Sequence, residues 1–125
     1  MSWGEEILRA LLLSLGAFEV ITNSVFLLKN EGLTLARKQH QELPKDIADS
    51  KIRLKVVLML LFGMAFFTVS FSSYILRKDM HLTTMLIVLL FSIYGLIEAM
   101  FYKYWKTWGF AVTTIVLLLL AVFTY

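Results

Sequence analysis

The sequence predicts an all-α integral membrane protein: a bundle of four transmembrane helices in a single membrane domain over residues 1–125. Hydrophobic residues make up 59% of the 125 residues and the mean hydropathy is +0.77, which is too apolar for a soluble domain of this size. Four apolar runs are long enough to cross the hydrocarbon core, which takes about 20 helical residues. None of these runs alternates like a barrel strand, so each is expected to be helical, because lipid offers the backbone no other partners.

The predicted spans are residues 7–28, 56–76, 82–102 and 107–125. The first carries Arg9 near its start and Glu19 inside, the third carries only Glu98, and the other two have no charge. Two acidic residues precede the first run where a signal peptide has basic ones, and no small-residue cleavage pattern follows it. We therefore expect the first span to be retained.

The connections between the spans are unequal: residues 29–55, 77–81 and 103–106. The short second and third links predict that the last three helices form neighbouring antiparallel hairpins, with the first helix packed against them. In the long connection, Gly32 is suited to cap the end of the first helix and Pro44 to begin the next. We expect an extension around residues 33–50 that leads into a long second helix.

The distribution of basic residues predicts the orientation. Of the twelve Lys and Arg residues, nine lie in the first and third connections and three lie elsewhere. The positive-inside rule therefore predicts a cytoplasmic connection 29–55 and both termini outside, most simply in the plasma membrane. Trp3, Trp105 and Trp108 fall at predicted span boundaries, as interfacial aromatic residues do.

The long connection also carries the candidates for contact with lipid or a partner protein. These are Arg37, Lys38, Lys51, Arg53 and Lys55. Residues 47, 51, 54, 55 and 58 follow helical spacing, which would lay an apolar edge on the membrane while Lys side chains reach phosphates. The alternative is a solvated loop that only sets topology, because acidic residues dilute the basic patch.

Polar residues inside the spans are the candidates for a transport path. On the first helix Gly16, Glu19 and Asn23 share one side, which lipid would penalise, so this polar stripe should face other helices or a water-filled cavity. Glu98 stands at the edge of a small-residue face on the third helix, and its depth is close to that of Asn23 and Thr113. The predicted transport or ion-path residues are Glu19, Asn23, Glu98, Tyr102 and Thr113.

Two interpretations of the carboxyls of Glu19 and Glu98 remain open. Desolvation favours the neutral form of a membrane carboxyl, which suits exchange of protons against a cation. Alternatively, Glu19 and Asn23 only hydrogen-bond across helices, for about 1 kcal/mol each, and Glu98 snorkels or pairs with a lysine.

The stretch FEVITNSVFLLKNEGLT, residues 18–34, resembles the first helix of the small multidrug resistance exporters. These are four-helix dimeric proteins whose first-helix glutamate exchanges protons for cationic drugs, and the resemblance implies that role for Glu19. It covers about one helix in four. The long first connection is foreign to that family, and its later aromatic and glycine motifs have no match here.

Other chemistry is not expected from this sequence. It has no cysteine, which excludes disulfides and thiolate metal sites. His40 and His81 lie in different connections, on opposite sides of the membrane, and are expected at the surface. With no phosphate loop, nucleophile elbow or zinc motif, we expect no enzyme activity, cofactor or metal. The net charge of +3 is explained by topology, so nucleic acid is not an expected partner.

Two functions remain from the sequence. The first is a small proton- or cation-coupled transporter or channel-type subunit that uses Glu19. A bundle this small has little interior, so a homo-oligomer is expected, with contacts at the small-residue faces of Gly95 and Ala99 or of Gly109 and Thr113. The second is a non-transporting accessory, assembly or immunity protein whose polar stripe docks a larger membrane partner.

Overall fold

The computed structural model describes residues 2–125, which form five α-helices and no strand. The helices are α1 (Trp3–Leu28), α2 (Gly32–Gln39), α3 (Asp49–Leu76), α4 (His81–Tyr102) and α5 (Trp105–Thr124). All but α2 are long and apolar enough to cross a membrane. The predicted all-α bundle of four transmembrane helices is therefore confirmed.

Each transmembrane helix begins before the apolar run that predicted it. The predicted ends at residues 28, 76 and 102 agree with the structure, whereas the starts move to residues 3, 49, 81 and 105. In α1 the early start has a local cause: Ser2 Oγ accepts a hydrogen bond from the Glu5 backbone N–H at 3.2 Å and so caps the helix. The carboxylates of Glu5 and Glu6 in the first turn also interact favourably with the helix dipole.

The prediction that Gly32 caps the end of the first helix is wrong. Lys29 is the C-cap of α1, and Gly32 begins the short helix α2. The backbone of Gly32 lies directly against the main chain of Phe26, which leaves no room for a side chain. The glycine therefore permits a sharp reversal, after which α2 folds back against α1.

The prediction that Pro44 starts the next helix is also wrong. Pro44 lies in the non-helical segment 40–48, which we call the α2–α3 loop, and α3 begins at Asp49. The Arg37 guanidinium donates hydrogen bonds to the backbone carbonyls of Lys45, at 3.2 Å, and Ile47, at 2.7 Å. These two carbonyls therefore accept hydrogen bonds from the side chain of Arg37 in α2, and not from backbone N–H groups of a following helical turn.

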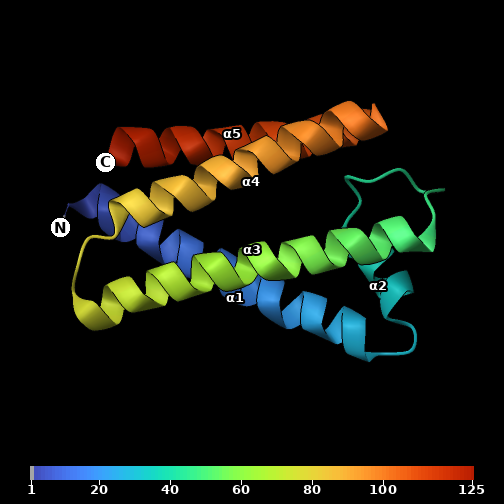
Figure 1. Cartoon of the computed structure of the whole chain (residues 1–125), viewed down its shortest axis with the longest axis horizontal. Helices are drawn as coiled ribbons and strands as arrows, with labels where there is room; N and C mark the ends of the chain where they lie inside the picture. The colour runs from blue at the N-terminus through green and yellow to red at the C-terminus, as the bar shows by residue number, and fades with distance from the viewer. Residues whose placement is uncertain (1) are drawn as a thin grey trace.

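The four long helices are arranged as two pairs (Figure 1). α1 packs along α3 and α4 packs along α5, while the pairs touch each other much less. α3 and α4 therefore pack against each other less extensively than the short link between them predicts. Both chain ends lie at one end of the bundle and α2 lies at the other (Figure 1), which we call the terminal end and the α2 end.

Glycines set the close approach within each pair. A Cβ on Gly16 would lie 2.5 Å from the backbone nitrogen of Phe67 and 2.8 Å from the carbonyl oxygen of Gly63, so α1 and α3 cross in direct backbone contact. A Cβ on Gly95 would lie 2.7 Å from Thr114 Oγ1. The small-residue face of Gly95 and Ala99 is therefore buried against α5 within the chain and is not free for a second copy.

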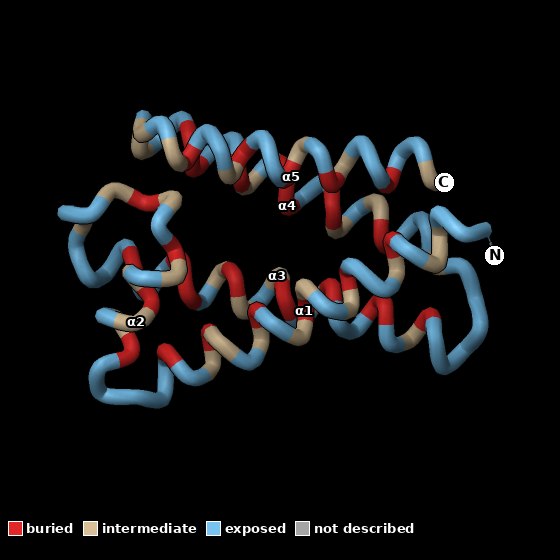
Figure 2. The backbone as a smooth tube through the Cα atoms, turned by 180° about the vertical axis from the view of Figure 1, so that it is seen from behind, coloured by how far each residue is buried: buried red, intermediate tan, exposed pale blue. Residues whose placement is uncertain are grey.

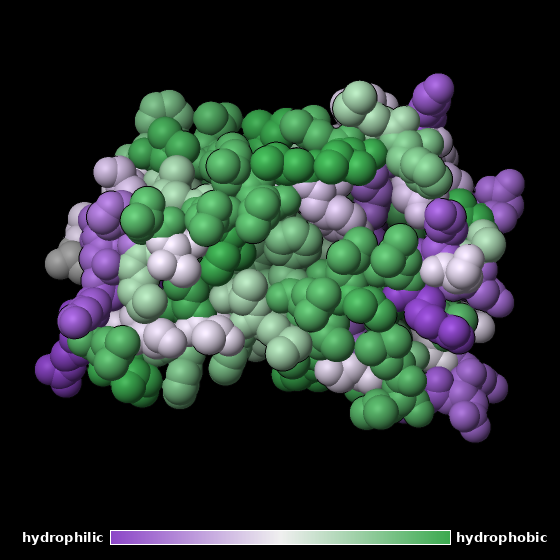
Figure 3. Space-filling model, viewed as in Figure 1, coloured by the Kyte–Doolittle hydropathy of each residue, from purple (hydrophilic) through white to green (hydrophobic). Residues whose placement is uncertain are grey.

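Buried residues follow the inner faces of the helices (Figure 2), and an apolar band covers the middle of the molecule with polar residues at both ends (Figure 3). Residues 2–125 form two apolar clusters in the interior. The larger is made of Leu8, Leu12, Met59, Phe66, Val88, Phe91, Leu117 and Ala121. The smaller, at the α2 end, is made of Phe26, Ala36, Leu43, Ile52 and Val56. On α1, Glu19 and Asn23 fall between the two.

Candidate functional site

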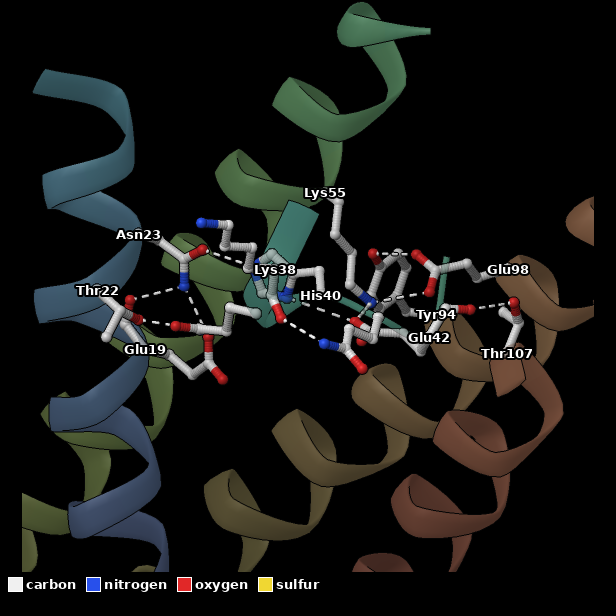
Figure 4. A network of polar contacts seen from close by, with 12 residues as sticks. Glu19, Thr22, Asn23, Lys38, His40, Glu42, Lys55, Tyr94, Glu98 and Thr107 are labelled. Atoms are coloured by element: carbon white, nitrogen blue, oxygen red, sulfur yellow. Dashed lines mark hydrogen bonds and ion pairs between the residues drawn. The ribbon is translucent and has the colours of Figure 1, made fainter. Parts of the chain in front are cut away.

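A connected set of polar side chains occupies the interior near the α2 end (Figure 4). It draws on α1, the α2–α3 loop, α3, α4 and α5. Its members are Glu19, Asn23, His40, Glu42, Lys55, Tyr94, Glu98 and Thr107, which we call the polar network. Burying a polar or charged group costs free energy unless the group has a hydrogen-bond or ion-pair partner. The partners of each side chain therefore determine which charges the polar network can carry.

Glu19 and Asn23 lie one turn apart on the buried face of α1, as the polar stripe predicts. Asn23 Nδ2 is 2.7 Å from the backbone oxygen of Glu19 and 2.6 Å from Glu19 Oε2. A backbone carbonyl only accepts hydrogen bonds, so the amide nitrogen of Asn23 must face it. The amide oxygen, Oδ1, is therefore directed away from Glu19 and is available as an acceptor.

His40 is buried, with 4% of its surface exposed, so its expected place at the surface is wrong. The reversal at Gly32 carries the end of α2 back to α1, where His40 Nε2 lies 2.9 Å from Asn23 Oδ1. Because Oδ1 accepts, Nε2 must carry a hydrogen. His40 Nδ1 lies 3.4 Å from Glu42 Oε1, and an ion pair forms there when the ring takes a second proton.

Lys55 is also buried, with 2% exposed, instead of contacting lipid or a partner. Its Nζ lies 2.8 Å from Glu98 Oε1 and 3.1 Å from Glu42 Oε1, and it stands 3.6 Å from the ring centroid of Phe110. A sequence signal existed: Ile52, Val56 and Met59 form the buried stripe of α3, and Lys55 falls on it.

Glu98 is held from two sides. Lys55 provides the ion pair at Oε1, and the hydroxyl of Tyr94, one turn earlier on α4, donates to Oε2 at 2.5 Å. The contact with Lys55 agrees with the second interpretation from the sequence, in which the Glu98 carboxyl pairs with a lysine. Its role in a transport path stays a prediction.

The charge state of Glu42 follows from its neighbours. Burial alone would raise the pKa of the Glu42 carboxyl, but the hydrogen bond that the protonated His40 ring donates from Nδ1 and the charge of Lys55 outweigh it and lower the pKa to about 2. Glu42 is therefore ionised at neutral pH. In contrast, Glu19 forms no ion pair with any Lys, Arg or His among residues 2–125.

Two further hydrogen bonds fasten the connecting segment to the bundle. Thr107 of α5 donates to the backbone oxygen of Glu42 at 2.5 Å, and Gln39 of α2 donates to Thr22 of α1 at 3.2 Å. These contacts join residues far apart in sequence, so no local pattern reveals them. The polar network is thus closed at the α2 end by a segment bound to both helix pairs.

At least three hollows lined by residues 2–125 reach the polar network. A groove of about 310 Å³ lies between α1 and α5 with Glu19 in its wall, and its rim residues Leu11, Val116 and Leu120 are exposed on the outer face of the bundle. We call it the Glu19 groove. A second groove, of about 260 Å³, lies between α3 and α4 beside Lys55 and Glu98.

The third hollow, of about 370 Å³, lies at the α2 end. Its lining includes His40 and the basic residues Arg37, Lys38, Lys45 and Lys106. We call it the basic pocket. His40 thus borders a hollow at the polar end of the molecule and also binds Asn23 in the interior.

Two other predicted path residues lie at the margin of the polar network. Thr113 is exposed, its hydroxyl donates to the Gly109 carbonyl of its own helix at 2.9 Å, and it lines the Glu19 groove, so its role in a transport path stays a prediction. The next residue, Thr114, faces inward because α5 presents Ala111, Thr114 and Leu117 to α4. Tyr102 is half-buried and lines the groove beside Glu98.

The predicted contact residues divide by environment. Lys38, Lys51 and Arg53 are exposed, which leaves their contacts with lipid or a partner as a prediction. Arg37 is half-buried and forms an ion pair with Asp49 at 2.7 Å, so its charge is largely used within the chain.

Among residues 2–125, no three His, Asp or Glu side chains are arranged to hold a metal ion. Comparison of the chain with family models, with curated proteins and with solved structures finds no match.

Proposed function

We propose that this chain is a small membrane transporter or channel-type subunit that couples movement of a cation to protons, with Glu19 as the carboxylate that binds them. The observation that carries the proposal is the environment of Glu19. It is 8% exposed, has no cationic partner among residues 2–125, and lies in the wall of the Glu19 groove. A buried carboxylate without a partner charge is a binding place for a proton or another cation.

Charge balance supports this assignment. The carboxyls of Glu19, Glu42 and Glu98 share one lysine, Lys55, and that lysine contacts only the latter two. Even a protonated His40 would leave the network with one negative charge if all three carboxyls were ionised. A cation that neutralises this remaining negative charge would bind at Glu19, because Glu42 and Glu98 already have cationic partners.

His40 supplies the link to protons. When its ring takes a second proton it adds a positive charge that acts on Glu19 through Asn23, and also on Glu42 and Lys55, the other charged groups that face it. A positive charge at His40 opposes a cation at Glu19, so protonation and cation binding compete. Asn23 fixes the orientation of both partners without itself carrying the proton.

The orientation is proposed from the distribution of basic residues. The positive-inside rule puts the α2 end in the cytoplasm and both termini outside, and the plasma membrane is the simplest location. A homo-oligomer would make contact through the exposed face of α5 that carries Gly109 and Thr113, where nothing lies within 4 Å of a Cβ built on Gly109.

The test is proton movement in liposomes that contain the protein and an internal pH dye. Na⁺, K⁺ or tetraphenylphosphonium, an amphiphilic cation suited to an apolar groove with one carboxylate, is added outside. We expect at least one probe to drive proton exchange in the wild type, and Glu19→Gln to abolish it. Glu31→Gln, an exposed residue outside the polar network, is the matched control and should keep wild-type flux.

Equal flux in the wild type and in Glu19→Gln contradicts the proposal. If no probe moves protons and the protein instead co-purifies in stoichiometric amounts with a larger membrane protein, the accessory function replaces it. Glu19, Asn23 and His40 would then be structural contacts.

A further inference from the structure

The basic pocket is a separate feature that the proposed function does not use. It is formed by α2, the α2–α3 loop and the starts of α3 and α5, and its charged lining residues are all basic. Beside them, the hydroxyl of Thr34 and the amide of Gln41 supply neutral polar groups. With a volume of about 370 Å³ it has room for a group the size of a phosphate ester.

Its positive charge is not cancelled inside the protein. Lys38, Lys45 and Lys106 form no ion pair among residues 2–125, whereas Arg37 is paired with Asp49. The three lysines come from α2, the loop and α5, so the fold brings together charges that are 7 to 68 positions apart. The Lys106 ammonium group also lies 5.5 Å from the centroid of the Trp105 ring, a contact that leaves its charge in place. Positive charges on residues around one hollow repel one another, and an anion bound between them removes this repulsion.

The surroundings place this pocket at the depth of lipid headgroups. Lys106 stands in the first turn of α5 beside Trp105 and Trp108, which are 72% and 45% exposed. Exposed tryptophans at the end of a transmembrane helix mark the interface between the acyl chains and the headgroups. Polar residues gather at the α2 end of the bundle, beyond the apolar band (Figure 3).

We infer that the basic pocket binds the phosphate of an anionic phospholipid, with phosphatidylglycerol as the probe. Basic pockets at the ends of transmembrane helices bind such headgroups through charge-assisted hydrogen bonds. Free inorganic phosphate offers the same chemistry, but the position beside two interfacial tryptophans favours a ligand that is anchored in the bilayer.

The experiment counts bound lipid by native mass spectrometry of the full-length protein in detergent. Phosphatidylglycerol and phosphatidylcholine with identical acyl chains are titrated separately. The pocket variant is Lys38→Gln, Lys45→Gln and Lys106→Gln combined. The matched control is Lys29→Gln, Arg53→Gln and Lys103→Gln, which removes equal charge at the same end of the bundle from exposed residues outside the pocket.

We expect the wild type to prefer phosphatidylglycerol, the pocket variant to lose affinity by on the order of 100-fold, and the control to stay within a few-fold of wild type. Thermal unfolding without lipid checks that both variants fold. Equal losses in the two variants would mean diffuse surface charge and would overturn the inference. Displacement of the lipid by inorganic phosphate at a similar concentration would make free phosphate the ligand and overturn the lipid assignment.

Discussion

Lys55 places a positive charge inside a membrane bundle, where charge is costly. Its Nζ is enclosed by the carboxylates of Glu42 and Glu98 and by the ring of Phe110, so its charge is balanced within the structure. Removing one partner of a buried ion pair leaves the other charge unpaired, and that uncompensated charge dominates the energetic effect.

We predict that Lys55→Met lowers the free energy of unfolding by about 3–5 kcal/mol, because Glu42 and Glu98 then face each other without a cation. Thermal or denaturant unfolding in detergent measures this change. Lys51→Met, an exposed residue one turn earlier on α3, should change stability by no more than about 0.5 kcal/mol. Adding Glu98→Gln to Lys55→Met should recover part of the loss, and similar losses in the Lys51 and Lys55 variants would contradict the buried pair.

Glu42 makes stability depend on acid pH. Its pKa is lowered from about 4.5 to about 2, because the hydrogen bond from the protonated His40 ring and the charge of Lys55 outweigh the opposing effect of burial. A carboxyl with a lowered folded-state pKa stabilises the protein fully above its unfolded pKa, and this contribution disappears as the pH falls towards the folded value. The contribution is on the order of 3 kcal/mol.

We therefore predict that the wild type loses stability between about pH 4.5 and pH 2, and that Glu42→Gln is less stable near neutral pH and loses less over this range. Tryptophan fluorescence during denaturation at several pH values follows the effect, with Glu31→Gln as the control. Parallel pH profiles for the wild type and Glu42→Gln would show that Glu42 is not held in this ion pair.

At the scale of elements, the crossing of α1 and α3 positions Glu19. Gly16 and Gly63 meet there, and a Cβ added at Gly63 would lie 2.8 Å from the Cβ of Glu19. The buried position of Glu19 therefore depends on the direct backbone contact between α1 and α3.

We predict that Gly16→Ala pushes α1 away from α3 and lowers stability by about 1–3 kcal/mol, because the new Cβ meets backbone atoms that cannot rotate away. Gly4→Ala on α1 is the matched control, since its Cβ would come no closer than 3.5 Å to another side chain, an ordinary van der Waals contact, and it should be neutral or slightly stabilising. Unfolding of both variants in the same detergent gives the comparison. A neutral Gly16→Ala would mean that α1 and α3 are not in direct backbone contact at this crossing.

At the scale of the whole molecule, composition and hydropathy were sufficient for the four-helix membrane fold, because lipid imposes length and apolarity on every span. The helix ends at residues 28, 76 and 102 follow from the same pattern. The buried stripe of Glu19 and Asn23 was also predictable, since lipid penalises polar residues on an outer helix face.

The rest of the polar network depends on contacts between distant residues. His40 lies in a connection that looks solvated, and it becomes buried only because Gly32 allows α2 to turn back onto α1. The position of Lys55 among apolar residues was visible, but a lysine near a helix end also suits the interface, and only the carboxylates of Glu42 and Glu98 decide between the two.

The proposed function requires that Glu19 exchanges its proton with water and that the charge of His40 acts on this carboxyl through Asn23. Infrared difference spectroscopy of the protein in lipid tests this directly. The carboxyl band that Glu19→Gln removes is identified first and is then followed across a pH titration and after transfer to deuterated water. We predict that this band responds to pH and exchanges readily, and that its response to pH changes in His40→Gln, which removes the charge that acts through Asn23. A band that stays protonated and unexchanged would mean that Glu19 is a structural hydrogen-bonding group, and would contradict the proposed function.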